Sequence, residues 1–251
     1  MTTMTRTRLA ADDPGEAMLS LRTDVGDIVR TPLSKAEAAM LDDVAPWRTF
    51  RMYYGQPHYS GTYWSATEHA HVIYESRLEL CRLLLADFAP DVKRIVAQPF
   101  LMQTVIRGKH LRHVPDYFLD TDDGPVVVDV KPRLRLDDPK VIETFAWVRH
   151  AVESKGWRFE IACEPPPVMM ENVRYLAGYR RRQYVSEPAL AALRQAKLDG
   201  FEIGTVLRRE TALPAPIMKA TLLHMLWAHD VSTDLDVVLS DRSILVRRSK
   251  R

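Results

Sequence analysis

The sequence has only two cysteines, Cys81 and Cys163, and no Cys-x-x-Cys pair. A disulfide framework and a cysteine zinc site are therefore not indicated, and we expect both side chains to be small core residues. Long apolar runs are also missing. No segment approaches the roughly 20 residues that a membrane span needs, and residues 1–18 lack the apolar centre of a secretory signal. We expect a soluble protein of the cytoplasm.

Further absences limit the chemistry. The sequence contains no glycine-rich phosphate loop and no Gly-x-Ser-x-Gly motif, so nucleotide hydrolysis and acyl transfer have no support. The net charge is only +2, so bulk electrostatics do not indicate nucleic acid. Basic residues cluster at Arg180, Arg181 and Arg182, close to Tyr184, and again in residues 246–251. These clusters suit phosphate contacts and aromatic stacking, or equally a solvated basic surface.

The chain has enough apolar material for one sizeable core and a smaller second unit, with 251 residues of which 46% are hydrophobic and 27% charged. Residues 1–45 show little periodicity and are interpreted as a mobile N-terminal arm with a short helix over Ser34–Leu41. Residues 46–168 are interpreted as one α/β domain that ends at three consecutive prolines. Residues 169–251 are interpreted as a C-terminal domain.

The middle domain shows alternating helix and strand patterns. Aromatic runs at 49–54 and 59–64 predict a hairpin, and apolar residues at helical spacing predict a helix over Glu68–Phe88. Strands are predicted over 93–98 with a continuation at 100–106, and over 114–119, 126–131 and 158–163. Asp138 and Pro139 predict the start of a helix before the last strand. This order predicts an α/β fold with a central mixed sheet flanked by helices.

The C-terminal domain reads as mainly helical. Helices are predicted over 172–181, 188–198 and 216–229, and alternation around a Ser-Asp-Arg turn predicts a hairpin over 235–247. Three helices and a terminal hairpin are typical of a winged-helix module. A helical dimerisation domain would show much the same pattern.

Charged residues within a buried strand are the main chemical signal. Asp129 and Lys131 stand among valines, where unpaired charge is costly, and strand alternation makes them project together. Asp116 begins the preceding strand, and the connecting turn, with Gly124 available for a positive φ, brings it within reach of Asp129. Converging carboxylates resist ionisation unless a cation lies between them, and their oxygens suit Mg²⁺ or Mn²⁺. Such a metal polarises a phosphodiester, and Lys131 would orient water or stabilise charge on phosphorus.

The pattern of Pro115-Asp116 followed by Asp129-Val130-Lys131 resembles the core motif of the PD-(D/E)XK nuclease superfamily. A salt-bridged surface hairpin is the alternative for the motif alone. The flanking sequence is similar to the TnsA-type heteromeric transposase endonucleases over about residues 46–165, and over the C-terminal part only in architecture. The segments that carry this resemblance are Tyr74–Glu79, Leu83–Phe88, Gln98–Phe100, Pro115–Tyr117 and Val128–Pro132.

The resemblance implies specific site residues. The family's helix glutamate corresponds to Glu79 and not Glu75, which agrees with the mostly apolar helix flank on which Glu79 lies. The family's metal-binding aspartate corresponds to Asp116 and its lysine to Lys131. The middle ligand, which can be glutamine in the family, is Asp129 here, which restores the usual acid of the superfamily.

The resemblance also implies a restriction-endonuclease-like core and a Mg²⁺- or Mn²⁺-dependent DNA endonuclease, associated with the nucleoid. It would cut one strand of double-stranded DNA at transposon ends, while a separate integrase-like transposase cuts and joins the other. The family's C-terminal domain meets the transposase or an ATPase regulator.

Other readings stay open. A stand-alone restriction, defence or repair nuclease would use the same core, and a non-catalytic DNA-binding assembly subunit would use the carboxylates only to structure the hairpin. His110 and His113 are interpreted as DNA-facing or structural, because no further zinc ligands occur at regular spacing. Glu143 is interpreted as a solvated helix residue or as a residue that assists the site.

Overall fold

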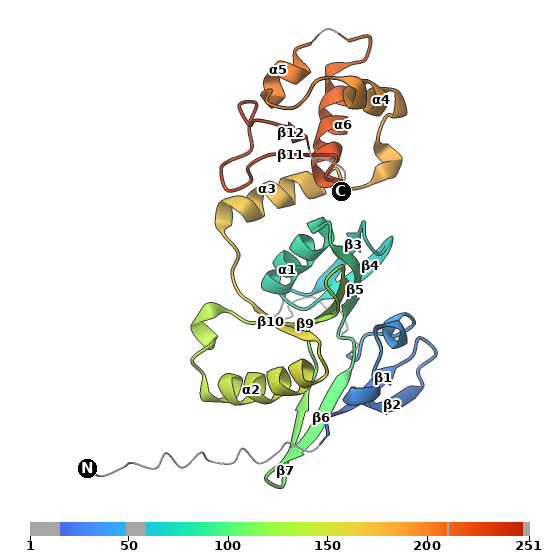
Figure 1. Cartoon of the computed structure of the whole chain (residues 1–251), viewed down its shortest axis with the longest axis vertical. Coiled ribbons are helices and arrows are strands. Elements are labelled where there is room, and N and C mark those ends of the chain that lie inside the picture. Colours follow the sequence, from blue (N-terminus) through green and yellow to red (C-terminus); the bar gives the residue numbers. More distant parts are fainter. Residues whose placement is uncertain (1–15, 49–58, 210, 248–251) are drawn as a thin grey trace, which may run out of the picture.

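A mixed four-stranded sheet forms the centre of the protein. The computed structural model describes residues 16–48, 59–209 and 211–247 (Figure 1). Strands β5 (Val92–Ala97), β8 (Tyr117–Thr121), β9 (Val126–Val130) and β10 (Arg158–Ala162) lie in the order β10-β9-β8-β5. The β9–β10 pair is parallel and the other two pairs are antiparallel. The prediction of an α/β fold with a mixed sheet is confirmed.

Helices cover both faces of this sheet. Val128 of β9 shares a buried cluster with Leu83 of α1 (Arg77–Phe88), while Val127 shares a second buried cluster with Val148 of α2 (Pro139–Ser154). Because both faces are buried, β9 is a nearly continuous valine run rather than an alternating strand. The start of α2 is as predicted, since Asp138 caps the helix by accepting a hydrogen bond from the Lys140 N–H at 3.0 Å.

Residues 16–45 are folded, so the prediction of a mobile arm is wrong for this range. Strands β1 (Met18–Arg22) and β2 (Ile28–Pro32) join β6 (Leu101–Ile106) and β7 (Lys109–His113) in an antiparallel sheet of order β2-β1-β6-β7. Leu19 is only 1% exposed. Two short 3₁₀ turns, η1 (Leu33–Lys35) and η2 (Ala38–Leu41), replace the predicted helix. The pairing of β1 with β6 spans about 80 residues of sequence, which local periodicity does not reveal, and residues 1–15 lie outside the described ranges.

The second aromatic run of the predicted hairpin forms a strand. This strand, β3 (Gly61–Ser65), pairs with β4 (Ala70–Tyr74), while the first run at 49–54 lies outside the described residues. The helix predicted from Glu68 therefore begins later, at Arg77, where the Ser76 hydroxyl accepts a hydrogen bond from the Glu79 N–H. β-Branched and aromatic residues in 70–74 suit a strand and explain this difference.

The described part of the C-terminal unit contains four helices, α3 (Pro167–Ala177), α4 (Glu187–Gln195), α5 (Ile203–Leu207) and α6 (Ala215–Trp227). A 3₁₀ turn, η4 (Arg182–Tyr184), lies between α3 and α4. Within the described residues, no helix has the length and apolar character needed to cross a membrane. Two short strands, β11 (Val231–Ser232) and β12 (Val246–Arg247), pair near the end, and Glu202 bridges to Ile244.

The prediction of a regular hairpin over 235–247 is wrong, since residues 233–245 form no strand. The buried amide of Asn172 on α3 explains why. Its nitrogen donates to the carbonyls of Leu235 and Val237 at 2.9 and 2.8 Å, and its oxygen accepts from the Leu239 N–H at 3.0 Å. These backbone groups bond to a side chain, so they have no need of a partner strand.

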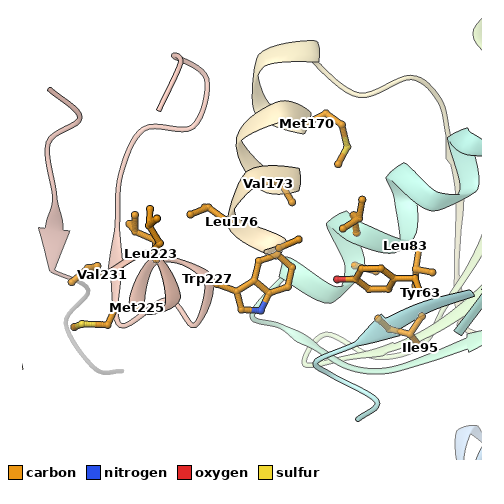
Figure 2. Close-up of a cluster of buried hydrophobic side chains, with 14 of the residues drawn as sticks. Tyr63, Leu83, Ile95, Met170, Val173, Leu176, Leu223, Met225, Trp227 and Val231 are labelled. Atoms are coloured by element: carbon orange, nitrogen blue, oxygen red, sulfur yellow. The ribbon is translucent and has the colours of Figure 1, made fainter. Parts of the chain in front are cut away.

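The C-terminal unit packs directly on the α/β core. Figure 2 shows Trp227 of α6 lying between the helices of the C-terminal unit and the core residues Tyr63 and Leu83. Trp227 is 5% exposed, and its ring lies 5.2 Å from that of Phe88 at the end of α1. The boundary predicted after residue 168 falls within α3, whose residue Leu176 is fully buried in the same cluster. One apolar core therefore continues across the predicted boundary.

The first prediction concerns the folded N-terminal segment. Leu19→Ala should lower the free energy of unfolding by about 2–5 kcal/mol, because it opens a cavity under β1. Val25→Ala, at a position that is 80% exposed in the β1–β2 turn, is the matched control and should change stability little. Urea unfolding measures both, and equal stabilities of the two variants would contradict the packing of β1 on the core.

Candidate active site

Asp116 and Asp129 meet where β8 begins and β9 ends. The antiparallel register pairs Tyr117 with Val128, so the next step along it brings Asp116 beside Asp129. The Val130 N–H donates to Asp116 Oδ2 at 2.6 Å. Burial raises the pKa of Asp116 to about 8, and the negative charges of Asp129 and Glu79 add to this rise. The two aspartates thus form the convergent pair that the hairpin predicted.

His113 contacts the carboxylate of Asp129 directly. Its Nε2 lies 2.8 Å from both Asp129 oxygens, and the Asp129 side chain is only 3% exposed. The edge of the imidazole packs against Trp147, with ring centroids 6.3 Å apart and planes at 90°. The sequence left His113 either facing DNA or structural. Its contact with Asp129 favours the structural role, as a residue that positions a carboxylate of the site. The sequence reasoning did not predict strand β7 at 109–113. This strand pairs His113 with Met102 of β6, on the face of the sheet that packs toward α2.

Glu79 lies in the first turn of α1 and forms a capping box. Its Oε1 accepts from the Ser76 hydroxyl at 2.9 Å, and its Oε2 accepts from the Glu75 N–H at 2.6 Å. Burial raises the pKa of Glu79, and the Glu75 and Ser76 hydrogen bonds oppose that rise. The negative charge of Glu79 also raises the pKa of Asp116, so the two carboxyl groups are close to each other. Both Glu79 oxygens nevertheless accept hydrogen bonds from residues at the start of α1.

Lys131 follows Asp129 by two residues and is half-buried. Its backbone N–H donates to the Ala162 carbonyl at 2.9 Å, which fixes the end of β9 against β10. The positive charge of Lys131 lowers the pKa of Asp116, opposing the effect of the two acids. The ammonium group therefore lies near the aspartate pair, as strand alternation predicted.

Gln98 contacts the backbone of Asp116 and was not predicted as a site residue, although it lies in a segment that carries the resemblance. Its backbone adopts φ of 47°, a left-handed conformation that is uncommon without glycine, and its N–H donates to the Asp116 carbonyl at 2.9 Å. Its side chain is 5% exposed and donates from Nε2 to Glu75 Oε1 at 2.8 Å. Gln98 thus links the backbone of Asp116 to the segment that precedes α1.

The donor set fits a hard cation in its chemistry. Asp116 and Asp129 supply carboxylate oxygens that repel each other when both are ionised, and one or two carboxylates plus water are a usual Mg²⁺ environment. Across the described residues, no three His, Cys, Asp or Glu side chains are gathered as a ready metal cluster. Consistent with this, the oxygens of Glu79 are turned to the capping box and those of Asp129 to His113.

The other candidate residues lie elsewhere. Arg180–Arg182 border a cavity at the far end of α1, and Tyr184 is 73% exposed on the surface. His110 is exposed on the face of β7 opposite to His113, and Glu143 forms an exposed ion pair with Lys109 at 2.8 Å. The structure therefore brings together Glu79, Asp116, Asp129 and Lys131, and leaves the arginine cluster outside this group.

The raised pKa of Asp116 predicts a pH-dependent stability of the metal-free protein. The folded state holds this proton up to about pH 8, whereas the ordinary pKa is 3.8, so the folded state binds more protons between these values. The free energy of unfolding should fall as pH rises through this window, by about 2 kcal/mol between pH 6 and 8 from this group alone. Asp116→Asn should remove that part of the decline. Urea unfolding in EDTA at both pH values measures it, and an equal decline in the two proteins would refute the assignment.

Comparison with known proteins covers the segment that contains the aspartate pair. Residues 89–164 match the family model described as TnsA-like endonuclease N terminal. This range contains Asp116, Asp129, Lys131 and His113, whereas Glu79 precedes it. A search of curated proteins found no match. The resemblance seen in the sequence is confirmed as a similarity: residues 89–164 match the TnsA-like endonuclease N-terminal model, which supports a TnsA-like nuclease family.

Proposed function

We propose that this protein is a metal-dependent DNA endonuclease subunit of a heteromeric transposase, which hydrolyses one strand at transposon ends. The observation that supports this most is the convergence of Asp116, Asp129 and Lys131 inside the TnsA-like domain. The domain supports nuclease activity, and the two coupled carboxylates supply the type of site that phosphodiester hydrolysis with Mg²⁺ or Mn²⁺ requires.

Asp116 and Asp129 would hold the metal, with Glu79 as a third ligand after its oxygens leave the capping box. When bound, a metal ion there would supply Lewis acidity toward the phosphodiester and would lower the pKa of bound water. Lys131 places a positive charge beside the same pair, where it stabilises negative charge that develops on the phosphoryl oxygens. His113 holds the Asp129 carboxylate in one orientation.

The architecture suits the same proposal at the level of fold. The sheet β10-β9-β8-β5, flanked by α1 and α2, is proposed as a restriction-endonuclease-like core. Helices α4, α5 and α6, followed by β11 and β12, are proposed as a winged-helix module. This unit would meet an integrase-like transposase or an ATPase regulator on DNA in the nucleoid.

A second candidate is a non-catalytic DNA-binding subunit whose carboxylates only structure the hairpin. The contacts of Asp129 with His113 and of Glu79 with Ser76 favour it, because they satisfy these acids without a metal. Metal binding separates the two candidates. A stand-alone nuclease differs from the first only in its partner.

The cleavage prediction uses purified protein and DNA that carries transposon ends. With Mg²⁺ or Mn²⁺ and a partner transposase, the protein should cleave one strand, and Asp116→Ala or Lys131→Ala should lower the rate by at least about a hundredfold. Glu143→Ala, outside the site, is the control and should cleave normally. Unchanged cleavage by Asp116→Ala would sink the site assignment, and robust cleavage without any partner would favour a stand-alone nuclease.

The His113 prediction measures metal affinity without DNA. His113→Ala should weaken Mn²⁺ binding by about 10- to 100-fold, because Asp129 loses the group that orients it. His110→Ala, on the opposite face of the same strand, should bind Mn²⁺ as the wild type does. Calorimetric titration at fixed pH reports the affinities, and thermal unfolding confirms that both variants are folded. Equal affinities in the two variants would remove His113 from the site, and no Mn²⁺ binding by wild type would favour the non-catalytic candidate.

A further inference from the structure

A cavity of about 650 Å³ lies between the α/β core and the C-terminal unit. Its walls come from the β3–β4 turn, the end of α1, the segment after α3 and the end of α6. In Figure 1 these elements meet where the C-terminal unit stacks on the core. The residues of its lining that matter here are Trp64, Asp87, Arg180, Arg181 and Arg182.

This cavity is distinct from the carboxylate site. Glu79 lies in the first turn of α1, whereas Asp87 and Phe88, which line the cavity, end the same helix. Glu79 and Asp87 are eight residues apart on this helix, which at 1.5 Å per residue separates the two places by about 12 Å along the helix axis. A ligand in the cavity therefore cannot be the phosphate at the aspartate pair.

Among the described residues that line the cavity, Asp87 is the single acid, and it does not oppose an anion because its oxygens already accept hydrogen bonds. Asp87 is 6% exposed and accepts from the Tyr63 and Ser65 hydroxyls at 2.7 and 2.5 Å. It also accepts from the N–H groups of Ala66 and Thr67 at 3.0 and 2.8 Å. Burial, together with Asp87, raises the pKa of Tyr63 well above its usual value, so the hydroxyl remains a donor. The arginines thus set the character of the cavity.

Two of the three arginines have structural partners. Arg180 donates from Nε to the Trp64 carbonyl at 2.8 Å and from Nη1 to the Ala177 carbonyl at 2.5 Å, which closes the end of α3. Arg182 forms an ion pair with Glu187. Neither side chain is free to serve as the main contact for a ligand.

Arg181 differs from both neighbours. Its guanidinium lies 4.4 Å from the Trp64 ring centroid. Hydrogen bonds from Gln183 and then from Arg181 lower the pKa of the Tyr184 hydroxyl. The side chain is half-buried, and among the described residues no carboxylate pairs with it. A partly desolvated arginine held on an aromatic ring, with no acid partner, is arranged to receive an anion.

We propose that Arg181, stacked on Trp64, is a second and non-catalytic contact for a phosphate of the DNA substrate. The proposal rests on the proposed function only in taking DNA as the substrate. Guanidinium recognises phosphate, and the cavity volume exceeds a single phosphate and admits the attached nucleoside.

The test measures DNA binding in EDTA, where no cleavage occurs, with fluorescein-labelled 30-base-pair duplex and fluorescence anisotropy over a range of salt. Arg181→Gln should weaken binding about three- to tenfold and reduce the salt slope by about one. Arg182→Gln removes the same charge from an ion-paired neighbour and should leave the slope unchanged. Arg149→Gln, on α2, removes an arginine that also stacks on an aromatic ring, at 5.1 Å from Phe159, and is the distant control.

The outcomes separate cleanly. Arg181→Lys keeps the charge and should keep the salt slope, which protects the test if the glutamine variant folds poorly. Equal slopes for wild type and Arg181→Gln overturn the inference. The inference is also overturned if Arg181→Gln weakens the binding of inorganic phosphate or dAMP but not the binding of DNA. That result would assign the cavity to free nucleotides. A protein that binds DNA through Arg181 yet never cleaves it would sink the proposed function and leave this inference standing.

Discussion

The mutual repulsion of Asp116 and Asp129 is the constraint around which the rest of the site is arranged. Two acids side by side in a buried hairpin destabilise the fold unless a proton, a cation or a set of donors offsets their charge. The polar groups around the pair offset this repulsion. The Val130 N–H and the Lys131 ammonium act on Asp116, and His113 acts on Asp129. The central sheet supplies the rigid frame that keeps the acids together despite the cost.

The sequence was sufficient for the parts of the site that depend on local geometry. Alternation along β9 placed Asp129 and Lys131 on one face, and the turn at Gly124, which adopts φ of 96°, set Asp116 beside them. The start of α2 at Asp138 and Pro139 could also be predicted, because helix capping depends on residues that are adjacent in the sequence. These features need only neighbours in sequence or across one short turn.

The features that were missed all depend on distant partners. β1 is a strand because β6 pairs with it, and residues 235–239 are irregular because Asn172 takes their hydrogen bonds. His113 became interpretable only when β7 was known to bring it to Asp129. Glu79 was placed on the right helix, but its side-chain rotamer, which turns both oxygens to the start of that helix, could not be predicted from the sequence. Long-range pairing and side-chain rotamers carry this information, and periodicity does not record them.

The apolar cluster that runs from α1 through α3 to α6 has a consequence for how the chain is divided. Leu83 and Tyr63 of the core bury themselves against Leu176 and Trp227, which follow the segment that matches the family model. Cutting the chain after that segment would expose the outer side of α1 to water. The segment that matches the family model is thus shorter than the apolar core that stabilises it, and the buried cluster extends over both parts of the chain.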